Sequence, residues 1–326
     1  MMLGFAVIGA GRIGALHAEN VARVIKGARL VAVMDADLER ARAAAVDGYS
    51  TDEFDKVLED RQVDAVLIAS PTDQHAGQMI AAARAGKAIF CEKPVSLDVQ
   101  LASSALQEVS KAGVPFQIGF QRRYDPGFAA AREQLDKIGR LEMFRAITCD
   151  PEPAPFEYLS GCGGIYADMA IHDIDIARFY GGDIVEVTAM GAALIVPQLA
   201  QVNDVDTSIL TMRFASGAIG VIQNSRRAVY GYEIRTELLG SGGKLVIEEE
   251  RATPLFRYDA SGIHGDFHGW FIKRFRQAYR DELQAFVDAV RAGSPPAPGT
   301  RDALESLRVA LAATRSLRDG GSVRVE

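Results

Sequence analysis

The first third of the chain alternates short apolar runs with longer segments of helical composition. The apolar runs have the length of single strands. The segments between them, such as Leu16–Lys26 and Gln74–Ala85, carry Ala, Glu, Arg and Gln at helical spacing. Strands that alternate with helices predict a parallel, doubly wound α/β sheet. The predicted strands are Leu3–Ile8, Leu30–Met34, Ala65–Ile68, Ala88–Cys91 and Pro115–Ile118.

The pattern changes after Gly119. A helical segment, Gly127–Leu135, leads to a strand over Met143–Thr148 and to the proline-rich stretch Pro151–Pro155. Strand-like runs joined by tight turns follow, and such runs predict an antiparallel sheet. These runs are Glu186–Val196, Asp206–Phe214, Ala218–Ser225, Tyr232–Leu239 and Lys244–Glu249, and the helices Ile272–Ala292 and Arg301–Leu317 come after them.

The two patterns predict two domains. Residues 1–120 form the doubly wound domain, and residues 121–326 form an α+β domain with a large, mainly antiparallel sheet. The sequence leaves open whether the last helix packs back on the first domain.

Composition narrows the class of partner. The chain has 326 residues, of which 48% are hydrophobic, and a net charge of −7. Its acidity argues against nucleic acid or an anionic membrane as a partner. No apolar run approaches the roughly 20 residues that span a bilayer, and Met1–Ala10 lacks the pattern of a signal peptide. We therefore expect a cytoplasmic protein with a small-molecule substrate. The cysteines Cys91, Cys149 and Cys162 are odd in number and lack a CxxC pairing, so we expect reduced thiols.

A glycine-rich motif follows the first predicted strand and precedes a helical pattern. In a G-x-G-x-x-G motif, the first glycine permits a tight turn, the second lets the backbone approach a pyrophosphate, and the third lets helix and strand pack closely. The helix N-terminus then faces the phosphates. Ordinary turns also gather glycines, so the motif alone is weak. It reads Gly9-Ala10-Gly11-Arg12-Ile13-Gly14.

Asp35, at the end of the second predicted strand, strengthens this interpretation. A carboxylate there accepts hydrogen bonds from ribose hydroxyls and repels a 2′-phosphate, which favours NAD over NADP. Aspartate is also a common turn former. S-adenosylmethionine binding or a vestigial fold are the alternatives to a dinucleotide site.

Several further motifs resemble the glucose-fructose oxidoreductase, inositol dehydrogenase and MocA (Gfo/Idh/MocA) family over nearly the whole chain. They are Ser70-Pro71-Thr72 with His75, Glu92-Lys93-Pro94, Gly163-Gly164 and the segment Asp168–Asp175. Within the family the chain is most similar to inositol 2-dehydrogenases, through Gly119–Pro126 and Tyr230–Arg235.

The resemblance implies an NAD-dependent dehydrogenase that oxidises a secondary hydroxyl of a cyclic polyol, such as myo-inositol, to the ketone. It also implies a homodimer or homotetramer, a cis peptide before Pro94, and a cofactor site that includes Ser70, Thr72, His75, Glu92, Lys93 and Gln121. The alternatives are a dehydrogenase of pyranoses or anhydrosugars, an NAD-dependent glycoside hydrolase, and a non-enzymatic NAD-binding regulator.

Oxidation of an alcohol needs a base and a group that stabilises the developing alkoxide. Asp168 and His172 lie four residues apart, on one face of a predicted helix, so the carboxylate can orient the imidazole that acts as base. Lys93, at the carboxyl end of a predicted parallel strand, can bind the hydroxyl. The family assigns these three positions to catalysis. The alternatives are a surface pair with a solvated lysine, or a zinc site that also uses Cys162.

Substrate contacts follow from family position. The resemblance suggests Arg122, Asp150, Asp175 and Tyr232 as hydroxyl partners beside Lys93, Asp168 and His172, with Asp175 and Asp150 also open to structural roles. Two departures from the family pattern bear on the substrate's identity. The loop Ile147–Pro151 lacks the Arg, or the His and Asn, common in inositol members, and Gln121 stands where Met or Asn is usual. The histidines His264 and His268 are predicted to lie in an exposed loop, because Gly265 and Gly269 disfavour a helix.

Overall fold

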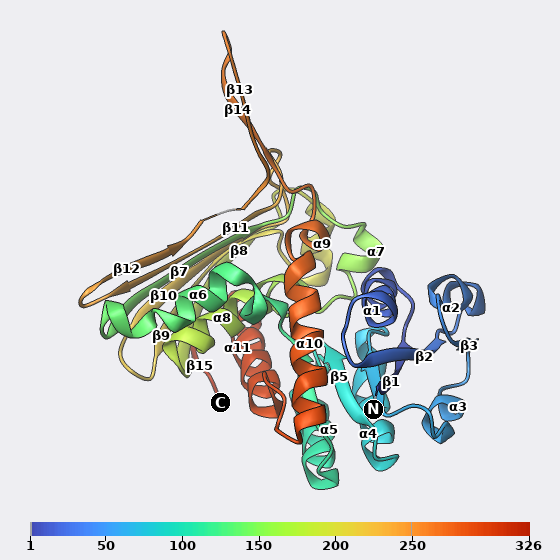
Figure 1. The fold of residues 1–326 in the computed structure, drawn as a ribbon. Coiled ribbons are helices and arrows are strands. Elements are labelled where there is room, and N and C mark those ends of the chain that lie inside the picture. The colour runs from blue at the N-terminus through green and yellow to red at the C-terminus, as the bar shows by residue number, and fades with distance from the viewer. Residues whose placement is uncertain (1, 249) are drawn as a thin grey trace. The chain divides into compact units, whose positions relative to one another are not determined.

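The computed structural model describes residues 2–248 and 250–326. Met1, the first residue of the predicted first domain, and Glu249, the last of a predicted strand, therefore lie outside the described residues. The chain forms two compact units (Figure 1). Unit 1 extends to Gln121 and also contains Ala278–Leu304, whereas unit 2 comprises Arg122–Gln277 and Glu305–Glu326. The segment that returns to unit 1 carries most of the penultimate helix rather than the last one.

Unit 1 contains a parallel sheet of six strands in the order β3-β2-β1-β4-β5-β6. All five strands predicted for the first third are confirmed. The strand that the sequence analysis missed, β3, has only three residues and no apolar run. The order reverses between β1 and β4, where doubly wound sheets bind ligands beyond the carboxyl ends of their strands. The strands are β1 (Leu3–Ile8), β2 (Ala28–Met34), β3 (Tyr49–Thr51), β4 (Ala65–Ile68), β5 (Ala88–Glu92) and β6 (Phe116–Gly119).

A helix from near the end of the sequence completes the core of unit 1. Phe286 packs edge-to-face on Phe5 and Phe90, with ring centroids 5.9 and 5.8 Å apart. The segment Ala278–Leu304 belongs to unit 1 because these aromatic rings are buried against the first sheet. The helices of unit 1 are α1 (Arg12–Arg23), α2 (Leu38–Ala44), α3 (Phe54–Glu59), α4 (Thr72–Arg84), α5 (Val99–Ala112) and most of α10 (Arg276–Ala292).

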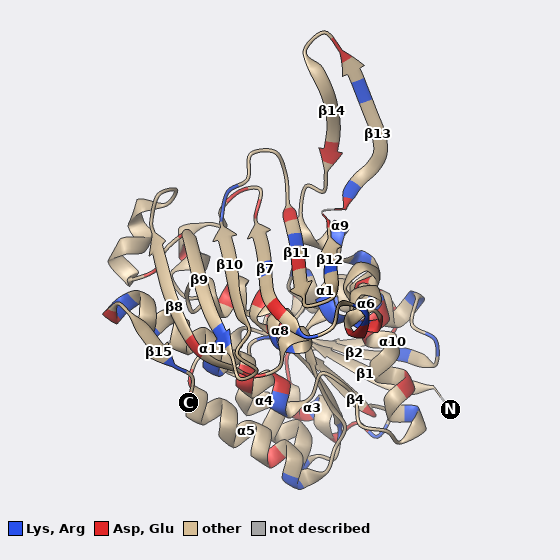
Figure 2. Cartoon of the chain, turned by 90° about the vertical axis from the view of Figure 1, so that its left-hand side faces the viewer, with Lys and Arg blue, Asp and Glu red and all other residues tan. Residues whose placement is uncertain are grey.

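Unit 2 is built on a seven-stranded sheet in the order β12-β11-β7-β10-β9-β8-β15 (Figure 2). The predicted mainly antiparallel pairing is confirmed, and the parallel pair is β7 with β10. These two strands are not consecutive, because β8, β9 and the helix α8 lie between them in sequence. The strands are β7 (Leu141–Cys149), β8 (Ile184–Ala192), β9 (Thr207–Phe214), β10 (Ile219–Ser225), β11 (Glu233–Gly240), β12 (Gly243–Ile247) and β15 (Ser322–Arg324).

The helices of unit 2 leave part of this sheet exposed. Helix α8 packs on β7 and β10. Along β9, buried residues alternate with exposed ones. The predicted single helix Ile272–Ala292 is wrong, because α9 ends at Arg274 and α10 begins at Arg276. No described helix is both long enough and apolar enough to cross a membrane. The helices are α6 (Pro126–Glu133), α7 (Phe156–Leu159), α8 (Ile171–Gly181), α9 (Phe271–Arg274) and most of α11 (Thr300–Asp319).

A two-stranded hairpin projects from unit 2 (Figures 1 and 2). It consists of β13 (Arg251–Asp259) and β14 (Gly262–Phe267), which the sequence analysis missed. The predicted loop position of His264 is wrong, since this residue lies in β14, whereas His268 follows the end of that strand. The pattern misled because strands exposed on both faces show no alternation of apolar and polar residues.

Candidate active site

The glycine-rich turn joins β1 directly to α1. Gly9 has a φ of +92°, and a Cβ there would lie 2.6 Å from the carbonyl oxygen of Ala69. A Cβ on Gly14 would overlap the carbonyl oxygen of Gly9. Gly11, by contrast, has no described atom within 4 Å of the position its Cβ would take. The tight turn, the close packing and the open approach therefore fall on the three glycines that the motif predicts.

The start of α1 suits an anion. The helix begins at Arg12, its N-cap Gly11 offers no side chain, and its fully described first turn holds no acidic residue. Its terminal N–H groups are thus available to a phosphate. Arg12 and Ile13, also predicted in this site, form the first turn.

Asp35 lies beside this turn. Its Oδ2 accepts a hydrogen bond from the Ala10 N–H (2.6 Å), and its Oδ1 accepts one from the Asp37 N–H (2.8 Å). A carboxylate has about four lone-pair sites. The group is therefore fixed in position and can still accept bonds from ribose hydroxyls.

Lys93 lies between Glu92 and Pro94 in the sequence, and each of these two neighbours contacts a buried histidine. His17 Nε2 and Glu92 Oε1 form a hydrogen bond of 2.8 Å on one side. On the other side His75 Nδ1 lies 2.8 Å from the Pro94 carbonyl oxygen. His75 Nε2 lies 2.7 Å from the Ser70 carbonyl oxygen, so the ring links two backbone segments, and burial lowers its pKa. The Lys93–Pro94 peptide is cis, which confirms that prediction.

The other predicted cofactor residues lie near the ends of unit 1 elements. The Ser70 hydroxyl donates to Gln78 Oε1 (2.6 Å), and Thr72 is the first residue of α4. Gln121 is buried at the start of a 3₁₀ turn. Their contacts with a cofactor stay predictions.

Asp168 and His172 stand out on an otherwise buried segment. Asp168 lies in a π-helical turn, Tyr166–Ala170, that leads directly into α8, where His172 is the second residue. Between Ile165 and Arg178, all of them described, every residue is buried except these two. The predicted regular helix is therefore wrong in detail, but the two side chains share the accessible side of the segment. Turns of this kind are frequent at functional sites.

Two residues that the sequence analysis missed hold Asp168. The buried Arg226 donates to Asp168 Oδ2 (3.0 Å), and the Tyr158 hydroxyl donates to Oδ1 (2.9 Å). Burial alone would lower the pKa of Arg226, but the Asp168 carboxylate helps to raise it overall. Arg226 could have been suspected from the sequence, because it directly follows a predicted strand and residues in the segments that connect strands often belong to functional sites.

Arg122 belongs to a buried network rather than to an open surface. Its guanidinium donates to Asp173 Oδ1 (2.5 Å) and to the Thr148 hydroxyl oxygen (3.2 Å). The Thr148 hydroxyl and the Asn224 amide also donate to Asp173. All four side chains are buried. The predicted contact between Arg122 and a substrate stays a prediction, and this network favours a supporting role for it.

The remaining predicted substrate residues differ in their surroundings. Asp175 is fully buried, and both its oxygens accept from Arg123 (2.6 and 2.8 Å), which favours its structural alternative. Tyr232 is buried, and this burial raises the pKa of its hydroxyl, so the group is a neutral donor. Asp150 is half-buried at the end of β7.

The zinc alternative would use the thiol of Cys162. Burial raises the pKa of its thiol to about 11, and Arg226 donates to its sulfur at 3.7 Å. Across residues 2–248 and 250–326, the side chains close enough to share one metal ion are His17, Glu92 and Glu282. These lie in unit 1, whereas Cys162 lies in unit 2.

The three predicted catalytic residues are divided between the units. Lys93 lies in unit 1, and Asp168 and His172 lie in unit 2. Their convergence on one substrate therefore stays a prediction.

Two family models match the chain. Residues 3–120 match the oxidoreductase family with an NAD-binding Rossmann fold, and residues 128–246 match the GFO/IDH/MocA C-terminal domain. Both halves of the predicted architecture are thus confirmed.

Full-length relatives carry the same fold. The myo-inositol 2-dehydrogenase of Thermotoga maritima is 40% identical over 98% of both chains. The structure of a myo-inositol dehydrogenase from Corynebacterium glutamicum matches with a TM-score of 0.95 at 36% identity, covering 100% of this chain and 99% of that one. The Lactobacillus casei scyllo-inositol dehydrogenase with bound NAD(H) and scyllo-inositol matches with a TM-score of 0.94 at 29% identity, over 100% and 99% of the two chains.

Proposed function

The chain belongs to the GFO/IDH/MocA oxidoreductase family, and on that premise we propose that it oxidises a secondary hydroxyl of an inositol to the ketone with NAD. The full-length relatives are named as dehydrogenases of myo-inositol and scyllo-inositol. The substrate class is therefore a cyclic polyol, and the products are a ring ketone and the reduced cofactor.

The residues of unit 1 fit NAD. The open approach at Gly11 and the uncapped start of α1 suit the pyrophosphate, and Asp35 suits the ribose. Bound NAD supplies the acceptor for the hydride that leaves the substrate carbon. The protein's own residues must then hold the ring and manage the hydroxyl proton.

His172 takes that proton. Asp168 keeps a negative charge beside it, which stabilises the imidazolium after proton uptake. Arg226 and Tyr158 fix the carboxylate, so it cannot turn away when the ring is charged. Lys93 donates to the substrate oxygen and stabilises the alkoxide that develops there.

Polar groups on unit 2 orient the ring. The neutral Tyr232 hydroxyl and the half-buried Asp150 are the hydroxyl partners that this function requires. A site built to bond several hydroxyls rejects isomers that misplace one of them, because a buried polar group is then left without its partner.

One observation carries the proposal: Asp168 and His172 are the two residues left accessible on a segment whose other side chains are buried. Exchanging His172 for Ala should lower kcat with myo-inositol and NAD at least about a hundredfold at neutral pH, the scale of a positioned base. Absorbance of the reduced cofactor measures this. The matched control is His264→Ala in β14, which should keep normal turnover. Near-normal turnover of His172→Ala would refute the assignment.

Self-association and a cytoplasmic location also belong to the proposal. Large apolar side chains stay exposed on the sheet of unit 2, among them Ile209, Ile219 and Met143. A second copy is the simplest cover for such a face in a homodimer or homotetramer. Ile219→Arg should therefore shift the protein towards monomer in sedimentation. An unchanged assembly would mean that another surface is used.

A further inference from the structure

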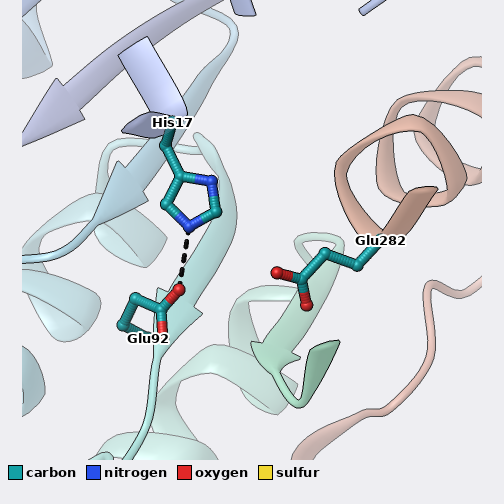
Figure 3. Close-up of side chains that lie close together, drawn as sticks. All are labelled: His17, Glu92 and Glu282. Carbon is teal, nitrogen blue, oxygen red and sulfur yellow. Dashed lines mark hydrogen bonds and ion pairs between the residues drawn. The ribbon is translucent and has the colours of Figure 1, made fainter. Parts of the chain in front are cut away.

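Three ionisable side chains from distant parts of unit 1 meet (Figure 3). His17 comes from α1, Glu92 from the end of β5, and Glu282 from α10. One ligand atom of each lies within 4.8 Å of the others. His17 and Glu282 are fully buried, and the Glu92 side chain is 13% exposed. We call this group the His17–Glu92–Glu282 cluster. Its member Glu92 directly precedes Lys93, the residue proposed to bind the substrate oxygen, in the sequence.

Glu282 is the unusual member. Its carboxylate points towards the His17–Glu92 pair (Figure 3), and neither of its oxygens has a hydrogen-bond partner among the described residues. The surroundings are apolar, because His17 packs edge-to-face against Phe90 and Tyr279 at 5.6 and 5.7 Å. A charge in such a place has a large desolvation penalty.

Two negative charges cannot both persist in this cluster without compensation. A shared metal ion is one form of compensation, but His17 Nε2 and Glu92 Oε1 are 2.8 Å apart. Two ligands of one tetrahedral zinc would be about 3.4 Å apart, given bond lengths near 2.05 Å. A proton is the other form. Burial, and next the Glu92 charge, raise the pKa of Glu282 well above its ordinary value.

The groups that face Glu282 are His17 from α1 and Glu92 from β5, with Tyr279 on its own helix beside His17. The Gln117 amide of β6 donates to the Glu282 main-chain oxygen (3.2 Å). Glu92 in turn packs over Gly119, where a Cβ would come within 3.0 Å of its carboxylate. The Glu92 carboxylate therefore lies between the Gly119 backbone and the His17 ring.

We propose that Glu282 is held as a neutral carboxylic acid and is a positioning residue, which keeps the Glu92 carboxylate on His17 and so fixes the backbone that carries Lys93. This inference rests on the proposed function, in which Lys93 binds the substrate oxygen. An ionised Glu282 would repel Glu92 and displace that backbone.

Kinetics of three variants test the positioning role. Glu282→Ala should lower kcat at least about tenfold, because the space it leaves lets the Glu92 carboxylate shift and small displacements of a catalytic group have large effects on rate, while KM for NAD changes little. Glu282→Gln, which keeps the shape of the neutral acid, should restore kcat. In wild type, kcat should fall at alkaline pH as Glu282 loses its proton, and Glu282→Gln should lack that fall. The matched control is Asp288→Asn, an exposed carboxylate on the same helix.

Stability against pH tests the protonation state without any substrate. A raised folded pKa gives stability that is fully present below the unfolded value of 4.5 and is lost as pH rises towards the folded pKa. The folded-to-unfolded ratio of wild type should therefore decrease relative to Glu282→Gln by up to about tenfold per pH unit above 4.5. Urea unfolding from pH 5 to 9 measures this gap.

The outcomes separate cleanly. A wild-type folded-to-unfolded ratio that does not fall relative to that of Glu282→Gln as the pH rises, or a Glu282→Gln enzyme as slow as Glu282→Ala, overturns the inference. So does a thermal shift with Zn²⁺ or Mn²⁺ in wild type that Glu282→Gln abolishes, since this would indicate an ionised cluster that binds a cation. If Glu282→Gln fails to fold, infrared spectra of wild type decide: a protonated carboxyl band that persists above pH 7 supports the inference, and its absence refutes it. Failure of inositol oxidation alone would leave the stability and infrared results readable.

Discussion

Both units contain buried carboxylates close in sequence to or packed near proposed catalytic residues, but the charge of these carboxylates is compensated differently in the two units. In unit 2, Asp173 faces Arg122 at 2.5 Å and Asp175 faces Arg123 at 2.6 Å. In unit 1, Glu282 faces another carboxylate, Glu92. A guanidinium stays charged at every pH that a folded protein experiences. A proton on a carboxyl group, by contrast, dissociates as the pH rises. The comparison therefore divides the molecule into a network that is indifferent to pH and a cluster that depends on it.

The largest expected effect comes from breaking a pair in unit 2. Arg122→Met should lower the free energy of unfolding by about 3–5 kcal/mol, because it leaves the Asp173 carboxylate buried without its cation. Urea unfolding measures this. Arg84→Met, which breaks the exposed pair with Glu108, is the control and should change stability by about 0–1 kcal/mol. A loss as small as the control's would mean that Asp173 is also neutral, and the contrast between the units would disappear.

The next effect is on rate. Arg226→Met should lower kcat up to about a hundredfold, the scale for a catalytic group displaced by about 1 Å, because Asp168 loses the buried donor that fixes it. Arg213→Met, which removes an exposed partner of Glu186, should leave kcat unchanged. Steady-state assays of both variants make the comparison. Equal rates would place Asp168 outside the chemistry.

Hydrogen exchange compares the two clusters in one molecule. After correction for the intrinsic pH dependence, protection of α10 around Glu282 should fall by up to about tenfold per pH unit above 4.5, because the raised folded pKa of Glu282 means that the unfolded state loses this proton at lower pH than the folded state does. Protection of α8 around Asp173 should not follow this trend. Parallel slopes in both helices would contradict the division.

The sequence predicted the strands that alternate with helices because their apolar runs and glycine turns are local signals. It missed β13 and β14 because both faces of that hairpin are exposed. It also treated Ile272–Ala292 as one helix, since the break at Phe275 depends on packing rather than on a glycine or proline. The sequence thus failed where an element lacks an apolar pattern or a glycine or proline at its boundary.

The candidate site shows a second limit. Gly11 and Asp35 could be assigned from a motif, since one strand–helix–strand unit fixes their spacing. The partners of Asp168 could not, because Arg226 lies 58 residues away in sequence. Glu282 looked like an ordinary helical residue, and only the fold brings it against Glu92, 190 positions earlier.

The smallest expected effect concerns the hydroxyl that links the unit 2 network. Thr148 donates to Asp173 Oδ1 (2.7 Å) and accepts from Arg122 (3.2 Å). Thr148→Val keeps the shape but removes both bonds, so the free energy of unfolding should fall by about 1–2 kcal/mol.

The loss should stay constant from pH 6 to 9, because the Arg122 guanidinium stays charged throughout that range. Thr211→Val is the control: its hydroxyl donates on the exposed side of β9, and its removal should be nearly neutral. Urea unfolding at several pH values measures both variants. A loss that grows with pH would show that proton binding also governs unit 2, and the two units would then handle buried charge in the same way.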